Sequence, residues 1–269
     1  MGEEQQRIQI PRVKLGTQGL EVSKLGFVCM GLTGGYSCPV SEEVGISIIK
    51  HAFHRGIIFF DTSDIYGPET NEILVGKVQL ATKREGTVSL KCLDVDYIDL
   101  YYQHRVDTNT LIEDTVRLLQ IRFLILLVVF YEGNLELGLF LIALLVAVSL
   151  VAKEWWKLCL QIVIWFQGEN LDKNKMLYLK VDKLAEKHGC SPAQLALAWV
   201  LRQGDDVAPI PGTTMIKNLD SNIDSVKVKL TAEGLKEISD AVPVNEVAGD
   251  LFPDTLSQLH WKFGNTQKP

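Results

Sequence analysis

The sequence predicts an α/β fold in which a parallel sheet closes into a (β/α)8 TIM barrel. Segments with strand character alternate with segments of helical periodicity along much of the chain, which is typical of a parallel sheet. The length of 269 residues, 47% of them hydrophobic, suits one large core and a single domain spanning residues 1–269. No GxGxxG motif follows the first strand, which favours the barrel over a doubly wound sheet.

The N-terminal elements follow from local patterns. Two short extended runs around a glycine turn predict a hairpin over residues 12–24, and the apolar run after it predicts a buried strand over 25–32. Apolar residues at helical spacing predict a helix over 41–56, with Ser41 as its N-cap. The β-branched and aromatic run IIFFD predicts a strand over 57–61.

The same alternation continues to the C-terminus, with Ser191 as an N-cap and Pro192 at the first helical position of one helix. The expected strands cover 78–83, 97–104 and 207–212. The expected helices cover 70–77, 111–119, 174–189, 191–203, 216–227 and 231–242.

Composition narrows the class of function. The net charge is −6 and no cluster of Lys or Arg occurs, so nucleic acid and anionic membranes are not expected partners, whereas a small molecule is. The five cysteines are odd in number and lack metal-ligand spacing, which indicates reduced thiols in the cytoplasm and no metal site. The polar N-terminus has no apolar core of a signal peptide.

Four polar residues stand at or just after predicted strand ends: Asp61, Tyr66, Lys83 and His104. In a parallel barrel these ends converge on one mouth, where catalytic groups lie. A tyrosine, whose pKa is near 10, protonates an alkoxide poorly at neutral pH unless a cation such as Lys83 lowers its pKa. Asp61 would hold that lysine and His104 would orient a carbonyl, while a cofactor supplies the hydride. Taken singly, each residue also has an ordinary structural explanation.

Whole segments around these residues resemble the aldo-keto reductase family. FFDTSDIYGPETNEILVGK is similar to its most specific signature, KLGFVCMGL to its first strand, and LDVDYIDLYYQHRVD to its fourth. The likeness is strongest to plant members of the perakine reductase-like and auxin-induced types. It implies NADPH-dependent reduction of aldehydes or ketones to alcohols, with catalytic Asp61, Tyr66, Lys83 and His104 and with Tyr66 as the proton donor.

A second segment, PIPGTTMIKNLDSNI, is similar to the family's eighth strand and the helix after it. The resemblance implies that this segment holds the adenosine 2′-phosphate of NADPH, and a helix N-terminus suits a phosphate. An ordinary turn and helix cap would produce a similar pattern. The cofactor-binding residues implied are Gly212, Thr213, Thr214, Lys217, Asn218 and Asn222.

The family pattern is absent between about residues 118 and 166, where strands five to seven would lie, so the barrel is expected to be incomplete. One nucleotide sequence can be written that encodes the family-like IVPYSPLGRGFFGGKGVVE. When the same nucleotides are read in the frame shifted by one base, they encode the stretch from Leu139 to Lys157. Tryptophan has a single codon, and the two adjacent codons of Trp155 and Trp156 correspond to the paired valine codons GTG GTG in the family-like frame. This agreement predicts a frame slip or a mispredicted splice junction, and residues 118–166 form an aberrant segment.

The chain is also shortened between Lys83 and Tyr97, where a crossover barely fits. Two alternatives to an active reductase therefore stay open. One is an inactive, truncated or mis-spliced remnant, and the other is a reductase-like regulatory binding protein similar to the β-subunits of potassium channels. Membrane insertion of residues 121–152 is not expected, because charged residues interrupt the apolar run.

Overall fold

The computed structural model describes residues 10–16, 19–34, 38–67, 69–78, 88–94, 98–100 and 168–249. Lys83, His104, the predicted helix over 111–119 and the aberrant segment over 118–166 lie outside these residues. Most of the predicted strands over 78–83 and 97–104 lie outside them as well. The described residues form two blocks, one before residue 101 and one after residue 167.

The first block begins with the predicted hairpin. Strand β1 (Arg12–Leu15) pairs antiparallel with β2 (Leu20–Ser23). Val13 and Leu15 alternate with exposed residues and pack with Val22 in a small apolar cluster. This period of two is what places one face of a strand in a core.

A parallel pair of strands follows the hairpin. Strand β3 (Phe27–Val28) lies beside β4 (Phe60–Asp61), with Phe27 opposite Phe60 and Val28 opposite Asp61. Both strands are shorter than the sequence predicts, because only these two residue pairs form the ladder and the 3-10 helix η1 (Met30–Leu32) follows β3. Helix α1 (Glu42–His54) connects the two strands, as parallel pairing requires.

Helix α1 starts where its cap predicts. The Ser41 hydroxyl accepts from the amide of Val44, and the face carrying Ile48, Ile49 and Ala52 is buried. Helix α2 (Thr70–Gly76) packs on α1, and α3 (Val88–Leu93) packs on α2 at Gly76, where a Cβ would lie 2.5 Å from the carbonyl oxygen of Leu93.

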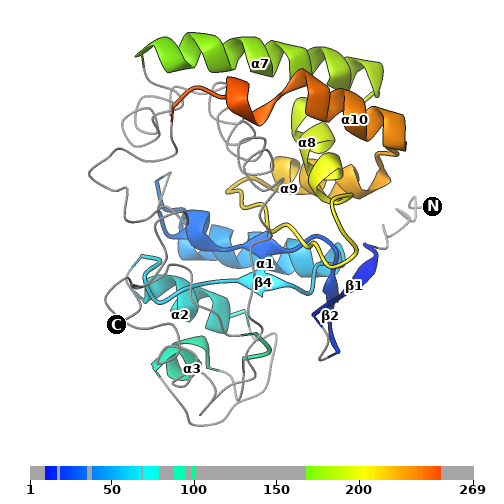
Figure 1. Ribbon diagram of the computed structural model, residues 1–269. Coiled ribbons are helices and arrows are strands. Elements are labelled where there is room, and N and C mark those ends of the chain that lie inside the picture. Colours follow the sequence, from blue (N-terminus) through cyan, green and yellow to red (C-terminus); the bar gives the residue numbers. More distant parts are fainter. Residues whose placement is uncertain are drawn as a thin grey trace, which may run out of the picture.

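The second block is helical. Its elements are α7 (Gly168–Lys187), α8 (Pro192–Val200), α9 (Ile216–Asp224), η3 (Ser225–Lys227), α10 (Ala232–Ala241) and η4 (Val244–Glu246). Figure 1 shows α7 and α10 together on one side, with α8 and α9 between them and α1. Residues 195–200 of α8 are all buried, and Leu197 packs in the cluster around β3 while Trp199 packs with α7 and α10. Helix α8 thus joins the two parts of the core.

The segment 207–212, predicted as a strand, is assigned no strand in the structure. It nevertheless lies along β3, because the amide of Gly26 donates to the carbonyl of Pro209 at 2.9 Å. Pro209 and Pro211 have no N–H to donate, so a regular ladder cannot form there. The order in space is therefore 207–212, β3, β4, with β3 in the middle.

Helices α1 and α9 are tied together by Asp220. Its carboxylate accepts from His51 Nε2 at 2.8 Å and also from the guanidinium of Arg55. His51 lies on α1 and Arg55 is the C-cap residue of this helix, so α9 is fixed against the helix that connects β3 to β4. None of the helices in the described parts of the chain is long and apolar enough to cross a membrane.

Candidate active site

Asp61 lies at the C-terminal end of β4, as predicted. Its side chain is buried, with the residue only 5% exposed, and its carbonyl accepts from the amide of Cys29 at 2.8 Å. Burial, and secondly the negative charge of Asp61, raise the pKa of the Cys29 thiol far above its ordinary value. Cys29 therefore stays a neutral thiol at this strand end.

Tyr66 lies in the tight turn between β4 and α2, with its side chain half-buried. Its amide donates to the carbonyl of Ser63 at 3.1 Å, and its own carbonyl accepts from the amide of Asn71 at 3.3 Å. Gly67 and Glu69 both have left-handed backbones, with φ of 56° and 64°. A left-handed glutamate is uncommon, so this turn is held in its shape by its surroundings.

The predicted set of four is therefore described only in part. Asp61 and Tyr66 lie five residues apart, at the end of β4 and in the turn that follows it. Lys83 and His104 lie outside the described residues, and their roles stay predictions.

The predicted phosphate segment lies beside the C-terminal end of β3. A Cβ on Gly212 would lie 2.8 Å from Cγ1 and 2.9 Å from the carbonyl oxygen of Val28, so only glycine permits this approach. The side chain of Thr214 lies next to η1, with its methyl 3.9 Å from the position of a Cβ on Gly31. Gly212 and Thr214 thus lie next to β3, the strand that pairs with β4 and Asp61.

The start of α9 fits a phosphate group. Helices α1, α8 and α10 each begin with a Ser or Thr hydroxyl that caps the first turn, whereas Met215 at the start of α9 provides no side-chain cap. The Thr213 hydroxyl accepts from the amide of Met215 at 3.1 Å. The amide of Asn218 donates to the Met215 carbonyl at 3.0 Å, no side chain caps the first turn, and Lys217 is exposed beside it.

The remaining two predicted cofactor residues are half-buried on α9. The carboxamide nitrogen of Asn218 lies 3.8 Å from the sulfur of Met215, and the backbone carbonyl of Asn222 accepts from the Ser225 hydroxyl at 2.6 Å. All six predicted cofactor residues therefore lie in one stretch from the end of segment 207–212 to the last turn of α9.

A fully buried polar residue, Asn71, was not expected from the sequence to belong to the site. Its carboxamide nitrogen donates to the carbonyl of Cys29 and to the hydroxyl of Thr33, both at 2.8 Å, and its oxygen accepts from the Thr62 hydroxyl at 2.7 Å. The only signal in the sequence is an amide in the first turn of a helix, which is an ordinary position for Asn.

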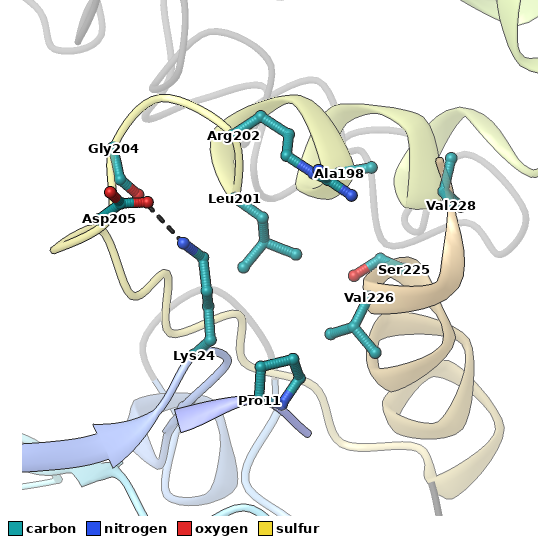
Figure 2. Close-up of a pocket in the computed structure, with 10 residues that line it drawn as sticks. All are labelled: Pro11, Lys24, Ala198, Leu201, Arg202, Gly204, Asp205, Ser225, Val226 and Val228. Atoms are coloured by element: carbon teal, nitrogen blue, oxygen red, sulfur yellow. Dashed lines mark hydrogen bonds between the residues drawn. The ribbon is translucent and has the colours of Figure 1, made fainter. Parts of the chain in front are cut away.

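A cavity of about 420 Å³ lies elsewhere, between the hairpin, α8 and η3 (Figure 2). Its lining residue Lys24 precedes β3, so the cavity lies at the N-terminal end of this strand, away from Asp61. The ammonium of Lys24 donates to the carbonyl of Gly204 at 3.1 Å. Arg202 follows the end of α8, where carbonyl groups favour a cation, and Asp205 adds a negative charge. The charged lining residues of this cavity are therefore two cations and one anion, and no predicted site residue lines it.

Two stretches of the chain match a family of known proteins. The model of the aldo/keto reductase family matches residues 24–88 and 154–243. The first stretch contains Asp61, Tyr66 and Lys83, and the second contains the whole cofactor segment. His104 lies between the two stretches. The match resumes at residue 154, so the last part of the segment predicted as aberrant, residues 154–166, falls within the family pattern.

A curated relative covers nearly the whole chain. A probable aldo-keto reductase from Glycine max is 44% identical over an alignment of 340 positions that includes 96% of this chain and 96% of the relative. Because this chain has 269 residues, many of the aligned positions of the relative have no counterpart here.

Solved structures share the fold. A glycerol dehydrogenase from Gluconobacter oxydans is 19% identical with a TM-score of 0.65, covering 90% of this chain and 98% of that one. The holo form of an aldo-keto reductase from Bacillus halodurans is 20% identical with a TM-score of 0.58, covering 88% and 97%. These structures indicate that the fold class is the (β/α)8 barrel. The family match and the curated relative imply carbonyl reduction with a nicotinamide cofactor. The chain belongs to the aldo/keto reductase family.

Proposed function

We propose that this protein reduces aldehydes or ketones with NADPH, with Tyr66 as the proton donor. The observation that carries the proposal is the arrangement around β3. Asp61 lies at the end of its neighbour β4, and the glycine-dependent approach of Gly212 brings the start of the cofactor segment to the same C-terminal end. Two parts of the chain that are far apart in sequence thus supply neighbouring halves of one site.

The roles of the residues follow from their chemistry. NADPH supplies the hydride when bound. Tyr66 donates the proton to the carbonyl oxygen, Lys83 lowers the pKa of Tyr66, and Asp61 holds Lys83 by charge. His104 orients the carbonyl through a hydrogen bond. The buried position of Asp61 supports this pairing, because a buried carboxylate strongly favours a nearby cation.

The preference for NADPH is also part of the proposal. The uncapped first turn of α9 and the exposed Lys217 suit the 2′-phosphate that distinguishes NADPH from NADH. Thr213 and Thr214 add hydroxyl groups beside this turn. On the basis of cysteine spacing we expect the enzyme in the cytoplasm, and on the basis of the quoted motifs we assign it to the perakine reductase-like plant subfamily.

A second candidate is an inactive remnant of such a reductase with an incomplete barrel. It is favoured by the gap in the family match between residues 89 and 153 and by the long alignment to the soybean relative. We propose that a frame slip or splice error produced the rewritten stretch that includes residues 139–157. Independent transcript clones that all encode this stretch in one unbroken frame would refute this origin.

Purified full-length protein decides between the two candidates. Quenching of protein fluorescence measures NADPH binding, and loss of nicotinamide absorbance with an aromatic aldehyde measures turnover. An active reductase turns over, and the Tyr66→Phe variant binds NADPH equally well but loses turnover. A chain that neither binds NADPH nor gains thermal stability from it is a remnant. NADH in place of NADPH tests the assignment of the phosphate segment.

A further inference from the structure

The hydrogen bonds of Asn71 join the segments that carry Asp61 and Tyr66. Asn71 is the second residue of α2 and has no exposed surface. Its carboxamide meets the end of β3 at the Cys29 carbonyl, the loop after η1 at Thr33, and the residue directly after Asp61, which is Thr62. The donor and acceptor atoms of these three hydrogen bonds are 2.7–2.8 Å apart. The carboxamide of Asn71 therefore bonds to three separate segments.

The chemistry of these contacts requires an amide. Two donors on nitrogen serve two acceptors, the Cys29 carbonyl and the Thr33 hydroxyl, while the oxygen serves the Thr62 hydroxyl. A carboxylate of the same shape has no hydrogen to donate and would face the Cys29 carbonyl oxygen. An apolar side chain of the same size would leave that carbonyl without this donor.

The backbone around Asn71 extends the network to Tyr66. The amide of Asn71 donates to the Tyr66 carbonyl at 3.3 Å, and the amide of Thr70 donates to the Gly67 carbonyl at 3.1 Å. The left-handed Gly67 lies against Thr33, since a Cβ there would lie 2.9 Å from the Thr33 hydroxyl oxygen. The turn that carries Tyr66 therefore rests on a residue that Asn71 itself holds.

We propose that Asn71 is a positioning residue that fixes Tyr66 relative to Asp61 through its carboxamide. It touches neither substrate nor cofactor and acts through Thr62 on the acid side and through Thr33 on the tyrosine side. The inference rests on the proposed function. Catalytic groups lose about a hundredfold in rate when displaced by roughly 1 Å. We therefore expect loss of Asn71 to lower kcat and to leave NADPH binding unchanged, because the phosphate segment lies on the other side of β3.

The chain offers a matched control in Asn174. This residue on α7 is 1% exposed, and its carboxamide exchanges two hydrogen bonds of 2.9 Å with the backbone of Ala248. Asn174→Ala therefore removes a buried, hydrogen-bonded amide of the same kind at a position remote from Asp61. Comparison of Asn71→Ala with Asn174→Ala separates positioning from general loss of stability.

The experiment measures kcat and KM with an aromatic aldehyde, and the stoichiometry and Kd of NADPH by fluorescence titration. We expect Asn71→Ala to lower kcat by about 10- to 100-fold per NADPH-binding site, and Asn174→Ala to leave kcat per site unchanged. Thr62→Val keeps the shape of its side chain and removes only the hydroxyl. We expect Thr62→Val to lower kcat as well, and this variant tests the proposal even if Asn71→Ala does not fold.

Two results overturn the inference in distinguishable ways. A wild-type protein without turnover refutes the proposed function and the role of Asn71 with it. An active wild type in which Asn71→Ala and Asn174→Ala have the same kcat per bound NADPH, or in which Thr62→Val is fully active, refutes the positioning role alone. The proposed function would then stand.

Discussion

Gly212→Ala tests whether segment 207–212 closes onto β3 as the structure indicates. The added Cβ would lie 2.8 Å from Cγ1 of Val28 and 2.9 Å from its carbonyl oxygen. Unstrained contacts between carbon atoms need roughly 3.5–4.0 Å, so the added Cβ and Cγ1 of Val28 must separate by about 0.7–1.2 Å. The carbonyl oxygen is backbone and cannot rotate away. The substitution therefore strains the packing beside the Gly26–Pro209 hydrogen bond of 2.9 Å.

Overpacking of this kind costs about 1–3 kcal/mol of the free energy of unfolding. For a chain of this size each kcal/mol lowers Tm by roughly 2–4 °C. We expect Gly212→Ala to melt earlier in a thermal scan followed by circular dichroism and to bind NADPH more weakly, because Thr213 and Thr214 move with Gly212.

Gly31→Ala is the matched control for this prediction. Its Cβ would meet only the Thr214 methyl, at 3.9 Å, which is an ordinary contact. Replacement of glycine by alanine at a position without strain is neutral or stabilises by about 0.4–1 kcal/mol. Equal melting temperatures for Gly212→Ala and the wild type, or equal losses in both variants, would show that Gly212 does not contact β3 as described.

Three further perturbations test separate parts of the fold. Because the pKa of the Cys29 thiol is raised above its ordinary value of 9.0, the unfolded chain loses this proton first as pH rises. The free energy of unfolding should then fall by up to ~1.4 kcal/mol per unit above about pH 9, and urea titrations of Cys29→Ala should show a shallower alkaline decline. Trp199→Ala should cost about 3–5 kcal/mol in urea, since Trp199 is 2% exposed and its indole N–H donates to the Ser239 hydroxyl at 3.1 Å. A loss under ~1 kcal/mol would place this side chain outside the core. Asp220→Asn should cost at most ~1 kcal/mol, because a third of the carboxylate is exposed, and the difference from wild type should shrink in concentrated salt.

Local chemistry made the helix starts predictable. The predicted N-caps Ser41 and Ser191 are both confirmed, because a hydroxyl that accepts from an amide three residues later needs no information from the rest of the chain. Helix α7 was predicted from residue 174 but begins at Gly168. Its first turns are polar and carry no apolar periodicity, so the sequence pattern could not indicate them.

Features that depend on distant neighbours were predictable only in part. The strand predicted over 207–212 is wrong: the segment lies beside β3, but its prolines remove the donors that a regular ladder requires. Asp61 and Tyr66 were predicted as site residues because they stand at a strand end and in the loop after it, and their catalytic roles stay predictions. Asn71 could not be found in this way, since its burial arises from β3, η1 and the loop after β4, which meet only in the folded chain.

In the proposed function, the cofactor segment and the catalytic residues lie on different sides of β3. Segment 207–212 and the start of α9 lie on one side of this strand, and Asp61 and Tyr66 follow on the other. Both sides come from stretches that match the family, whereas His104 belongs to the stretch that does not. The rewritten segment 118–166 begins after His104 and would carry strands five to seven of the barrel. A chain rewritten there can still bind the phosphate of NADPH while it lacks the strands that complete the barrel around the substrate. Tight NADPH binding without turnover would place the defect in the rewritten middle rather than in the described site, and replacement of that middle by the corresponding soybean sequence should then restore turnover.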